Sequence, residues 1–381
     1  MANNKLHSWI RKIRMEWGFD SLAAISRLTA ISRTTAFSSI VALGSMLSSC
    51  NDLMHDDLPP CDMGVDLQFK YDYNVQRADM FNDHVGGVCV FVFDEQGNLV
   101  ARQDAANEGK SQPLKDPNYA MRIDLQPGKY HFATFAFQKK YEEALSQAGA
   151  KFHIEAPAAG ENIEKLRTRL DRNAGKVENQ ALPLDTLWQG LSNETVEVKD
   201  LQITHHTISL IRDTKQLTIS LHQLDAPADI HAEDFSYQIT DANGYINYDN
   251  SLLPDEELTY TPYKTWTTEF TTPEGTVQER TAHAALMFSR LVLHPVTENE
   301  KNAILSIWNK KTGEEVVRIN LADFLAQGRG AFEAMNYSAQ EFLDREYDYK
   351  LDFFLKGDKW QYVKLGISIL DWSKRIQRAD L

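Results

Sequence analysis

The sequence predicts an all-β fold with minor short helices, arranged as two antiparallel β-sandwiches in tandem. Apolar and polar residues alternate with a period of two along many short segments, and turns that contain glycine separate these segments by about 8–12 residues. The pattern starts again near Ile208, and a chain of 381 residues is long enough for two cores. We therefore expect an N-terminal sandwich over residues 63–205 and a C-terminal sandwich over residues 206–381.

The first sandwich is predicted from alternation and turns. Val65, Leu67, Phe69 and Tyr71 alternate with polar residues, which is typical of a half-buried strand. Further strands are expected over residues 88–93, from residue 99, from residue 130 and over residues 195–198. Short helices are expected over residues 74–81 and 139–147, and a polar helix or loop over residues 161–170.

The second sandwich shows the same signals. Strands are expected over residues 208–221, 235–239, 245–248, 286–293, 304–308, 316–321, 347–355 and 362–370. Lys311-Thr312-Gly313 predicts a hairpin between two of these strands. Short helices are expected over residues 322–326 and 338–345.

Composition excludes several classes of protein. Lys and Arg total 40 against 54 Asp and Glu, a net charge of −14, so the phosphate backbone of a nucleic acid would be repelled. Three cysteines are too few for a disulfide-rich scaffold or a multi-cysteine zinc protein. No stretch supplies the roughly 18 consecutive apolar residues of a membrane-spanning helix.

The N-terminus resembles the signal of a bacterial lipoprotein. Residues 36–47 form a short apolar run after Arg27 and Arg33, as in the hydrophobic region of a secretory signal. Leu47, Ser48, Ser49 and Cys50 follow and resemble a lipobox, in which the cysteine receives diacylglycerol and becomes the first residue. We expect residues 1–49 to be removed and residues 50–62 to form a lipidated tether.

Acyl chains on Cys50 would have to hold the protein at the membrane without help from its charge. Removal of residues 1–49, with six basic and two acidic side chains, changes the net charge from −14 to −18. Two or three acyl chains suffice for stable attachment, at about 0.8 kcal/mol per buried CH₂. The diacylglycerol and palmitate on Cys50 are the only non-protein groups that we expect. The acidic residues 52–57 resemble an export signal to the outer face of the outer membrane, or else form a solvated tether.

Two cysteines remain for a disulfide. Cys61 and Cys89 would close a loop of 28 residues and tie the tether to the strand over residues 88–93, which is worth about 3 kcal/mol in the loop-entropy model. The alternative is a pair of free, buried thiols.

No residue pattern supports catalysis or metal binding. His205 and His206 are neighbours on a predicted strand, so they point to opposite faces and cannot share a metal ion. Asp241-Ala242-Asn243-Gly244 places its glycine too early for a calcium loop and is interpreted as a turn. Motifs of hydrolases, metalloproteases and nucleotide-binding enzymes are missing from the sequence. Tryptophans such as Trp266 could line a sugar platform, although core packing is their commoner use.

A set of ordered fragments is similar to the FimB family of fimbrial anchor subunits. The fragments are Asp57-Leu58-Pro59-Pro60-Cys61, Leu67-Gln68-Phe69-Lys70-Tyr71-Asp72-Tyr73-Asn74, Ala78-Asp79-Met80-Phe81, Val90-Phe91-Val92-Phe93-Asp94-Glu95-Gln96-Gly97-Asn98, Leu187-Trp188-Gln189-Gly190, Ser209-Leu210-Ile211-Arg212-Asp213-Thr214-Lys215, Tyr260-Thr261-Pro262, Ser289-Arg290-Leu291 and Ile367-Ser368-Ile369-Leu370-Asp371-Trp372. They extend over nearly all of the chain after the leader.

The resemblance implies two transthyretin-like sandwiches in an outer-membrane lipoprotein that tethers a type V fimbrium and limits its length. The implied partner is the fimbrial shaft subunit, which would add a strand to a free sheet edge of this chain. Residues 373–381 are mostly polar and form a poor donor strand, as expected of a terminal subunit. The alternatives are a shaft or tip fimbrillin of the same superfamily and a surface glycan-binding lipoprotein.

Overall fold

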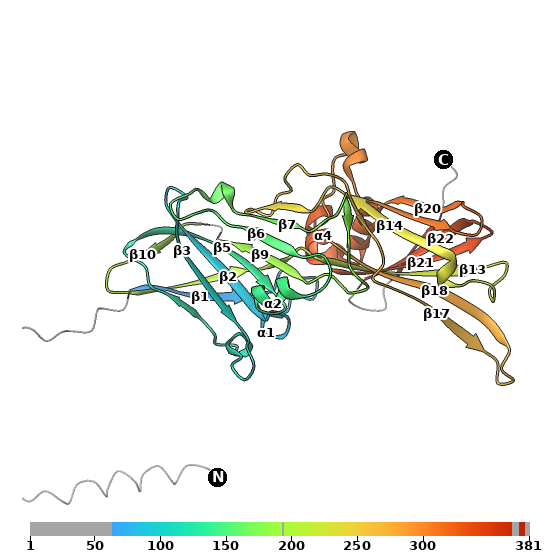
Figure 1. Ribbon diagram of the computed structural model, residues 1–381, viewed down its shortest axis with the longest axis horizontal. Coiled ribbons are helices and arrows are strands. Elements are labelled where there is room, and N and C mark those ends of the chain that lie inside the picture. Colours follow the sequence, from blue (N-terminus) through green and yellow to red (C-terminus); the bar gives the residue numbers. More distant parts are fainter. Residues whose placement is uncertain (1–62, 193, 368–372, 378–381) are drawn as a thin grey trace, which may run out of the picture. The chain divides into compact units, whose positions relative to one another are not determined.

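The computed structural model describes residues 63–192, 194–367 and 373–377. Within these residues strands dominate, in five sheets, and the helices are short (Figure 1). The all-β fold with minor short helices that the sequence predicts is confirmed. None of the described helices is long and apolar enough to cross a bilayer.

Two sheets are built mainly from the first half of the chain. The smaller one has the order β11-β1-β4, and the larger one has the order β12-β9-β5-β2-β3 with β10 paired to β5. Their strands are β1 (Gly64–Lys70), β2 (Gly87–Asp94), β3 (Leu99–Ala106), β4 (Met121–Ile123), β5 (Gly128–Phe137), β9 (Leu187–Leu191), β10 (Val196–Val198), β11 (Ile203–Ser209) and β12 (Ile211–Arg212).

Two further sheets contain most of the second half. One has the order β17-β18-β13-β21-β22-β23 and the other β20-β19-β14-β16-β8. Their strands are β8 (Lys176–Val177), β13 (Lys215–Gln223), β14 (Phe235–Asp241), β16 (Leu258–Tyr260), β17 (Lys264–Thr271), β18 (Val277–Phe288), β19 (Ile304–Asn309), β20 (Glu315–Asn320), β21 (Asp348–Lys356), β22 (Lys359–Ile367) and β23 (Ser373–Gln377).

The fifth sheet joins strands from both halves, in the order β15-β7-β6. Its strands are β6 (Phe152–Glu155), β7 (Arg167–Leu170) and β15 (Tyr245–Asn247). A second link is the pairing of β8 with β16, and β11 extends across residue 205. Strand pairing therefore joins the two halves at these points, and the division into two domains at residue 205 stays a prediction.

The helices connect or cap the sheets. They are α1 (Phe81–His84), α2 (Tyr141–Ser146), α3 (Leu321–Ala326), α4 (Ala339–Arg345) and the 3-10 helices η1 (Pro113–Lys115), η2 (Ile163–Lys165), η3 (Ala232–Asp234), η4 (Val296–Lys301) and η5 (Gln327–Met335). Each end of α4 follows local sequence signals, because the Ser338 hydroxyl accepts a hydrogen bond from the Glu341 amide and Arg345 lies in the last turn.

The apolar side chains form two cores, and β2 lies between them. Cys89, Phe91 and Phe93 belong to one core, whereas Val88 and Val90 belong to the other. Because successive residues of a strand point to opposite faces, a run of apolar residues fits a strand that is buried on both sides.

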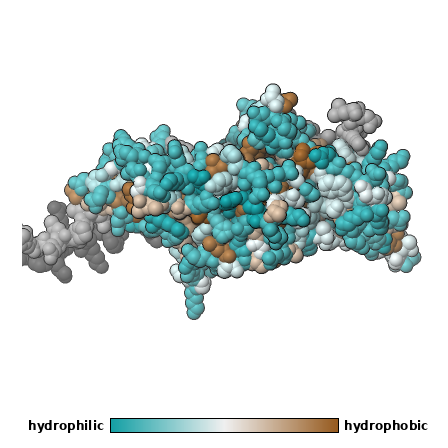
Figure 2. All heavy atoms as spheres, turned by 45° about the horizontal axis from the view of Figure 1, so that its top comes forward, coloured by the Kyte–Doolittle hydropathy of each residue, from teal (hydrophilic) through white to brown (hydrophobic). Residues whose placement is uncertain are grey.

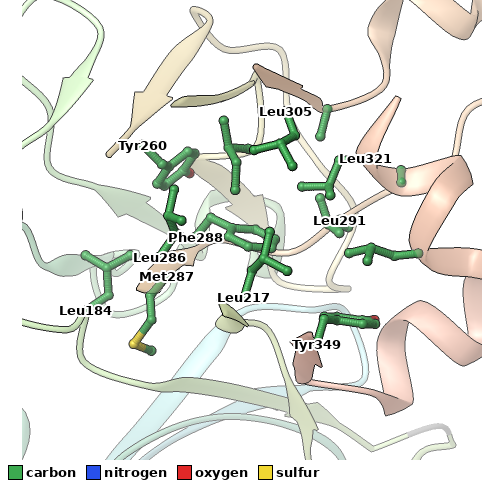
Figure 3. Close-up of a cluster of buried hydrophobic side chains, with 14 of the residues drawn as sticks. Leu184, Leu217, Tyr260, Leu286, Met287, Phe288, Leu291, Leu305, Leu321 and Tyr349 are labelled. Carbon is green, nitrogen blue, oxygen red and sulfur yellow. The ribbon is translucent and has the colours of Figure 1, made fainter. Parts of the chain in front are cut away.

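The larger core extends into the second half of the chain. Figure 3 shows Phe288 among side chains from several strands, with Tyr260 on one side and Leu217 on the other. The rings of Tyr260 and Phe288 meet edge to face at 6.3 Å. The face of the molecule drawn in Figure 2 is mostly hydrophilic.

Three local expectations are corrected by the structure. The helix expected over residues 74–81 is wrong, because the buried Asn74 amide instead donates to the carbonyls of Tyr71 and Ala78 and closes a loop. Residues 161–170 contain η2 and the strand β7. The strand expected over residues 286–293 ends at Phe288. Beyond it, the carbonyls of Ser289 and Arg290 accept hydrogen bonds from the Asn243 side-chain amide instead of from a neighbouring strand.

Candidate functional site

The predicted attachment residues precede the described part of the chain. Leu47, Ser48, Ser49 and Cys50 lie outside the described residues, so lipidation stays a prediction. The first described strand after them is β1, which lies between two neighbours. It pairs in parallel with β11 over seven register positions and antiparallel with β4 over three. The first described strand of the chain is therefore the central strand of its sheet.

The first residues of β1 are closely packed. Gly64 has a φ of +132°, and a Cβ at this position would lie 2.3 Å from the carbonyl oxygen of Ile123. The Arg122 guanidinium donates to Asp66 at 2.7 Å and lowers the pKa of that carboxyl below its usual value. The strand is thus fixed at its first residues by backbone pairing and by an ion pair.

The two cysteines of the predicted disulfide are not both described. Cys89 has a buried free thiol on β2, and the Arg102 guanidinium lies 3.8 Å from its sulfur. Burial raises the pKa of this thiol to about 12. Cys61 lies outside the described residues, so its pairing with Cys89 stays a prediction.

His205 and His206 lie on β11 and have different surroundings. His205 is exposed, 3.7 Å from Asp66, whereas the ring of His206 stacks on Phe132 with centroids 6.4 Å apart. In the part of the chain that the structure describes, no group of three or more His, Cys, Asp or Glu side chains is placed to hold a metal ion.

The turn Asp241-Ala242-Asn243-Gly244 has a packing role. The Asn243 side chain is fully buried, and it accepts a hydrogen bond of 2.6 Å from the Tyr260 hydroxyl. Burial also raises the pKa of Asp241 to about 7. The turn holds the end of β14 against β16 and β18.

A buried ionic network lies where β13 follows β12. The Lys215 ammonium is fully buried and donates to the carbonyls of Asp344 and Glu346 at 3.0 Å each. Arg290 forms two hydrogen bonds of 2.9 Å with the Asp344 carboxylate. Burial lowers the pKa of Lys215 and raises that of the adjacent Asp213. The Lys215 ammonium and the Arg290 guanidinium thus direct their donors to groups within the network, which is typical of a structural role.

Two arginines extend this network by stacking on aromatic rings. The Arg212 guanidinium lies 4.2 Å from the ring centroid of Tyr347, and that of Arg345 lies 3.9 Å from Tyr73. Arg345 of α4 is thereby held against Tyr73, which follows β1, and Tyr347, which precedes β21, is held against Arg212 of β12.

The remaining candidate features are sheet edges, where backbone N–H and C=O groups can accept another strand. One is β11, the edge of the three-stranded sheet, beside a groove of about 440 Å³ lined by Leu191, His206, Thr207 and Ile211. Another is β17, the edge of the C-terminal six-stranded sheet.

The opposite edge of that six-stranded sheet is formed by the C-terminal segment. Residues Ser373–Gln377 form β23 and pair antiparallel with β22 over five register positions. Sequence reasoning found the polar character of this segment but did not identify it as a strand. It also missed β17, whose sequence KTWTTEFT is rich in residues with high β-propensity but has no apolar alternation.

The chain matches a known protein family over most of its length. Residues 58–378 match the model of the family described as fimbrillin-A associated anchor proteins Mfa1 and Mfa2. A search of functionally curated proteins returned no match to this chain.

Several solved structures are similar to the described fold. A candidate adhesin from Bacteroides thetaiotaomicron VPI-5482 is 30% identical with a TM-score of 0.70, and the alignment covers 84% of this chain and 100% of that one. A candidate polysaccharide-binding protein from the same organism is 28% identical with a TM-score of 0.65, covering 83% and 99%.

The fimbrial anchor protein Mfa2 from Porphyromonas gingivalis is 17% identical with a TM-score of 0.56, covering 81% of this chain and 98% of that one, and it supports the fold. The family match extends from the end of the predicted tether to β23 and includes all of the sheets. The chain therefore belongs to the family of fimbrillin-A associated anchor proteins.

Proposed function

We propose that this chain is the lipid-anchored base subunit of a cell-surface fimbrium. Acyl groups on Cys50 hold it in the outer membrane, and a shaft subunit adds a strand to one of its free sheet edges. The family match supports a fimbrial anchor role. Such a role depends on attachment and backbone pairing and requires no catalytic residue.

The single observation that carries the proposal is the placement of the two ends of the described chain. At the N-terminal end, β1 connects the tether to the centre of a sheet. At the C-terminal end, the backbone of β23 is paired with β22 of the same chain. A subunit that can receive a strand but whose own C-terminal segment is already paired ends a fibre, and this limits the length of the fibre.

The test is the substitution Cys50→Ala, with Ser49→Ala as the matched control. Alanine at position 49 keeps a small residue before the cleavage site, whereas alanine at position 50 removes the sulfur that accepts the lipid. We expect Cys50→Ala to release long fibres into the medium and Ser49→Ala to leave fibres on the cell. Electron microscopy of cells and of medium measures both. Normal attachment of fibres in the Cys50→Ala strain contradicts the proposal.

A further inference from the structure

We propose that the free edge of β17 is the surface on which this subunit receives an extended strand of the neighbouring fimbrial subunit. The inference rests on the proposed function for the existence of that neighbour, and it adds the location of the contact and the chemistry of the strand. β17 comprises Lys264–Thr271 and pairs with β18 on one side only.

No described residue pairs with the backbone of β17 on the side away from β18. The sheet ends at this strand, and hydrogen bonds between the backbone of Lys264–Thr271 and any segment other than β18 are missing from the described residues. The nearest covering element is η3, whose Ala232 amide donates to the Thr267 hydroxyl and not to the backbone of β17. An eight-residue row of backbone donors and acceptors thus remains available for pairing.

The usual protections of an edge strand are weak here. Natural edges carry prolines, inward-pointing charges, or charged side chains along their length. β3, at the edge of the other six-stranded sheet, has the Arg102–Asp104 ion pair, and Gln103 donates to the carbonyl of Arg122. β17 has Lys264 only at its start and Glu269 near its end, with Trp266, Thr267 and Thr268 between them. The middle of β17 is therefore open to another strand.

Part of β17 extends beyond the sheet as a two-stranded ribbon. The last register pair between β13 and β18 is His222 with Thr281, whereas β17 and β18 continue to the pairs Phe270–Glu279 and Thr271–Val277. Phe270 is 63% exposed. The loop after β13 supports this ribbon at one point, where the Arg280 amide donates to the Pro227 carbonyl at 2.8 Å, and a third strand beside β17 would add to this support and cover Phe270.

The side chains of β17 indicate what the added strand contains. Trp266 and Phe270 are four residues apart on a strand, so they lie on the same face. His283 stacks on the Trp266 indole with centroids 4.9 Å apart and an interplanar angle of 13°, and the Lys264 ammonium lies 5.2 Å from the centroid of the same ring, so Trp266 is held in place on the edge strand. Apolar residues at alternating positions of the added strand would contact Trp266 and Phe270.

Charge favours a neutral or basic strand from another protein over a second copy of this chain. Glu274 lies in the loop between β17 and β18, and Glu279 lies opposite Phe270 on the exposed ribbon. Two copies, each with a net charge of −18 after removal of residues 1–49, repel one another. The occupant we assign is an extended segment with alternating apolar residues and with a basic residue near the ribbon end.

The β17–β18 ribbon lies far from β1 within the described residues. In Figure 1, β1 begins at one end of the described body and the β17–β18 ribbon projects from the other end.

The decisive experiment is photo-crosslinking in cells with the full chain. Phe270→p-benzoylphenylalanine places the reactive group on β17, Thr207→p-benzoylphenylalanine places it beside the groove at β11, and Val296→p-benzoylphenylalanine is the exposed control. We expect an adduct between position 270 and an extended segment of the shaft subunit, identified by peptide mass spectrometry, and no such adduct at position 296. An adduct at position 207 alone, or a crosslinked dimer of this chain at position 270, overturns the inference.

Alanine variants test the energetic role of the same edge. We expect Phe270→Ala with Trp266→Ala to lower the number of cell-attached fibres at least ~10-fold, and Val296→Ala to leave it unchanged. Phe270 is exposed, so we expect Phe270→Ala alone to leave the amount of folded protein unchanged. We expect this single variant to lower the number of cell-attached fibres less than the double variant does. Unchanged attachment in both β17 variants overturns the inference, whereas normal attachment in Cys50→Ala contradicts the proposed function.

Discussion

The buried ion pair between Arg290 and Asp344 allows a quantitative test of how the interior is held together. Their side chains are 12% and 9% exposed, and the pair has two hydrogen bonds of 2.9 Å. Asp344→Ala leaves the guanidinium buried without its carboxylate, and it also removes an acceptor from Gln340. We expect the free energy of unfolding to fall by about 3–5 kcal/mol, the usual cost of removing one partner of a buried pair.

Urea unfolding followed by tryptophan fluorescence measures this change, on the non-lipidated protein that carries Cys50→Ala. The matched control is Glu298→Ala, which removes an ion pair to Lys301 whose side chains are 47% and 55% exposed. We expect this control to leave the free energy of unfolding unchanged within error, because water solvates both charges in the exposed pair.

A double variant separates the effect of an unpaired charge from that of lost packing. Arg290→Met with Asp344→Leu replaces both charges with apolar side chains, and we expect it to recover most of the loss. If Asp344→Ala costs no more than Glu298→Ala, the reasoning that burial sets the magnitude is refuted.

Two further predictions concern single buried groups. Because burial raises the pKa of Cys89 to about 12, we expect iodoacetamide at pH 8 to alkylate it at least ~10-fold more slowly in the folded, reduced protein than in urea, and equal rates would show that the thiol is accessible. Burial raises the pKa of Asp241 to about 7, above the value of about 4 in the unfolded chain, so its contribution to stability is fully present below pH 4 and is lost as the pH rises through 7. Asp241→Asn should therefore raise the Tm more at pH 8 than at pH 5, and an equal change at both pH values would show that Asp241 does not titrate in this range.

The elements predictable from the sequence are those whose signals are local. β2 is a continuous apolar run, and α4 follows a serine with a glutamate three residues later. The Lys311-Thr312-Gly313 turn places glycine at a φ of +76°, where other residues are strained. In each case the residues that determine the element are neighbours in the chain.

Elements defined by distant partners were not predictable in the same way. β1 pairs in parallel with β11, which begins at Ile203, and the two-residue strand β8 exists through its pairing with β16. β17 lacks apolar alternation because its side chains are exposed or only half-buried, so neither face of the strand requires a row of apolar residues. For the candidate site, the sequence predicts Cys50 from a local motif, whereas the free edge of β17 is visible only once the sheet order is known.

The parallel pairing of β1 with β11 has a mechanical consequence. A pull on Gly64 along β1 shears this strand past its neighbours instead of peeling it from one end. In a parallel ladder the hydrogen bonds are evenly spaced, so the seven register positions with β11 bear the load together. The strand through which force would enter the body is thus held in the orientation that best resists extraction.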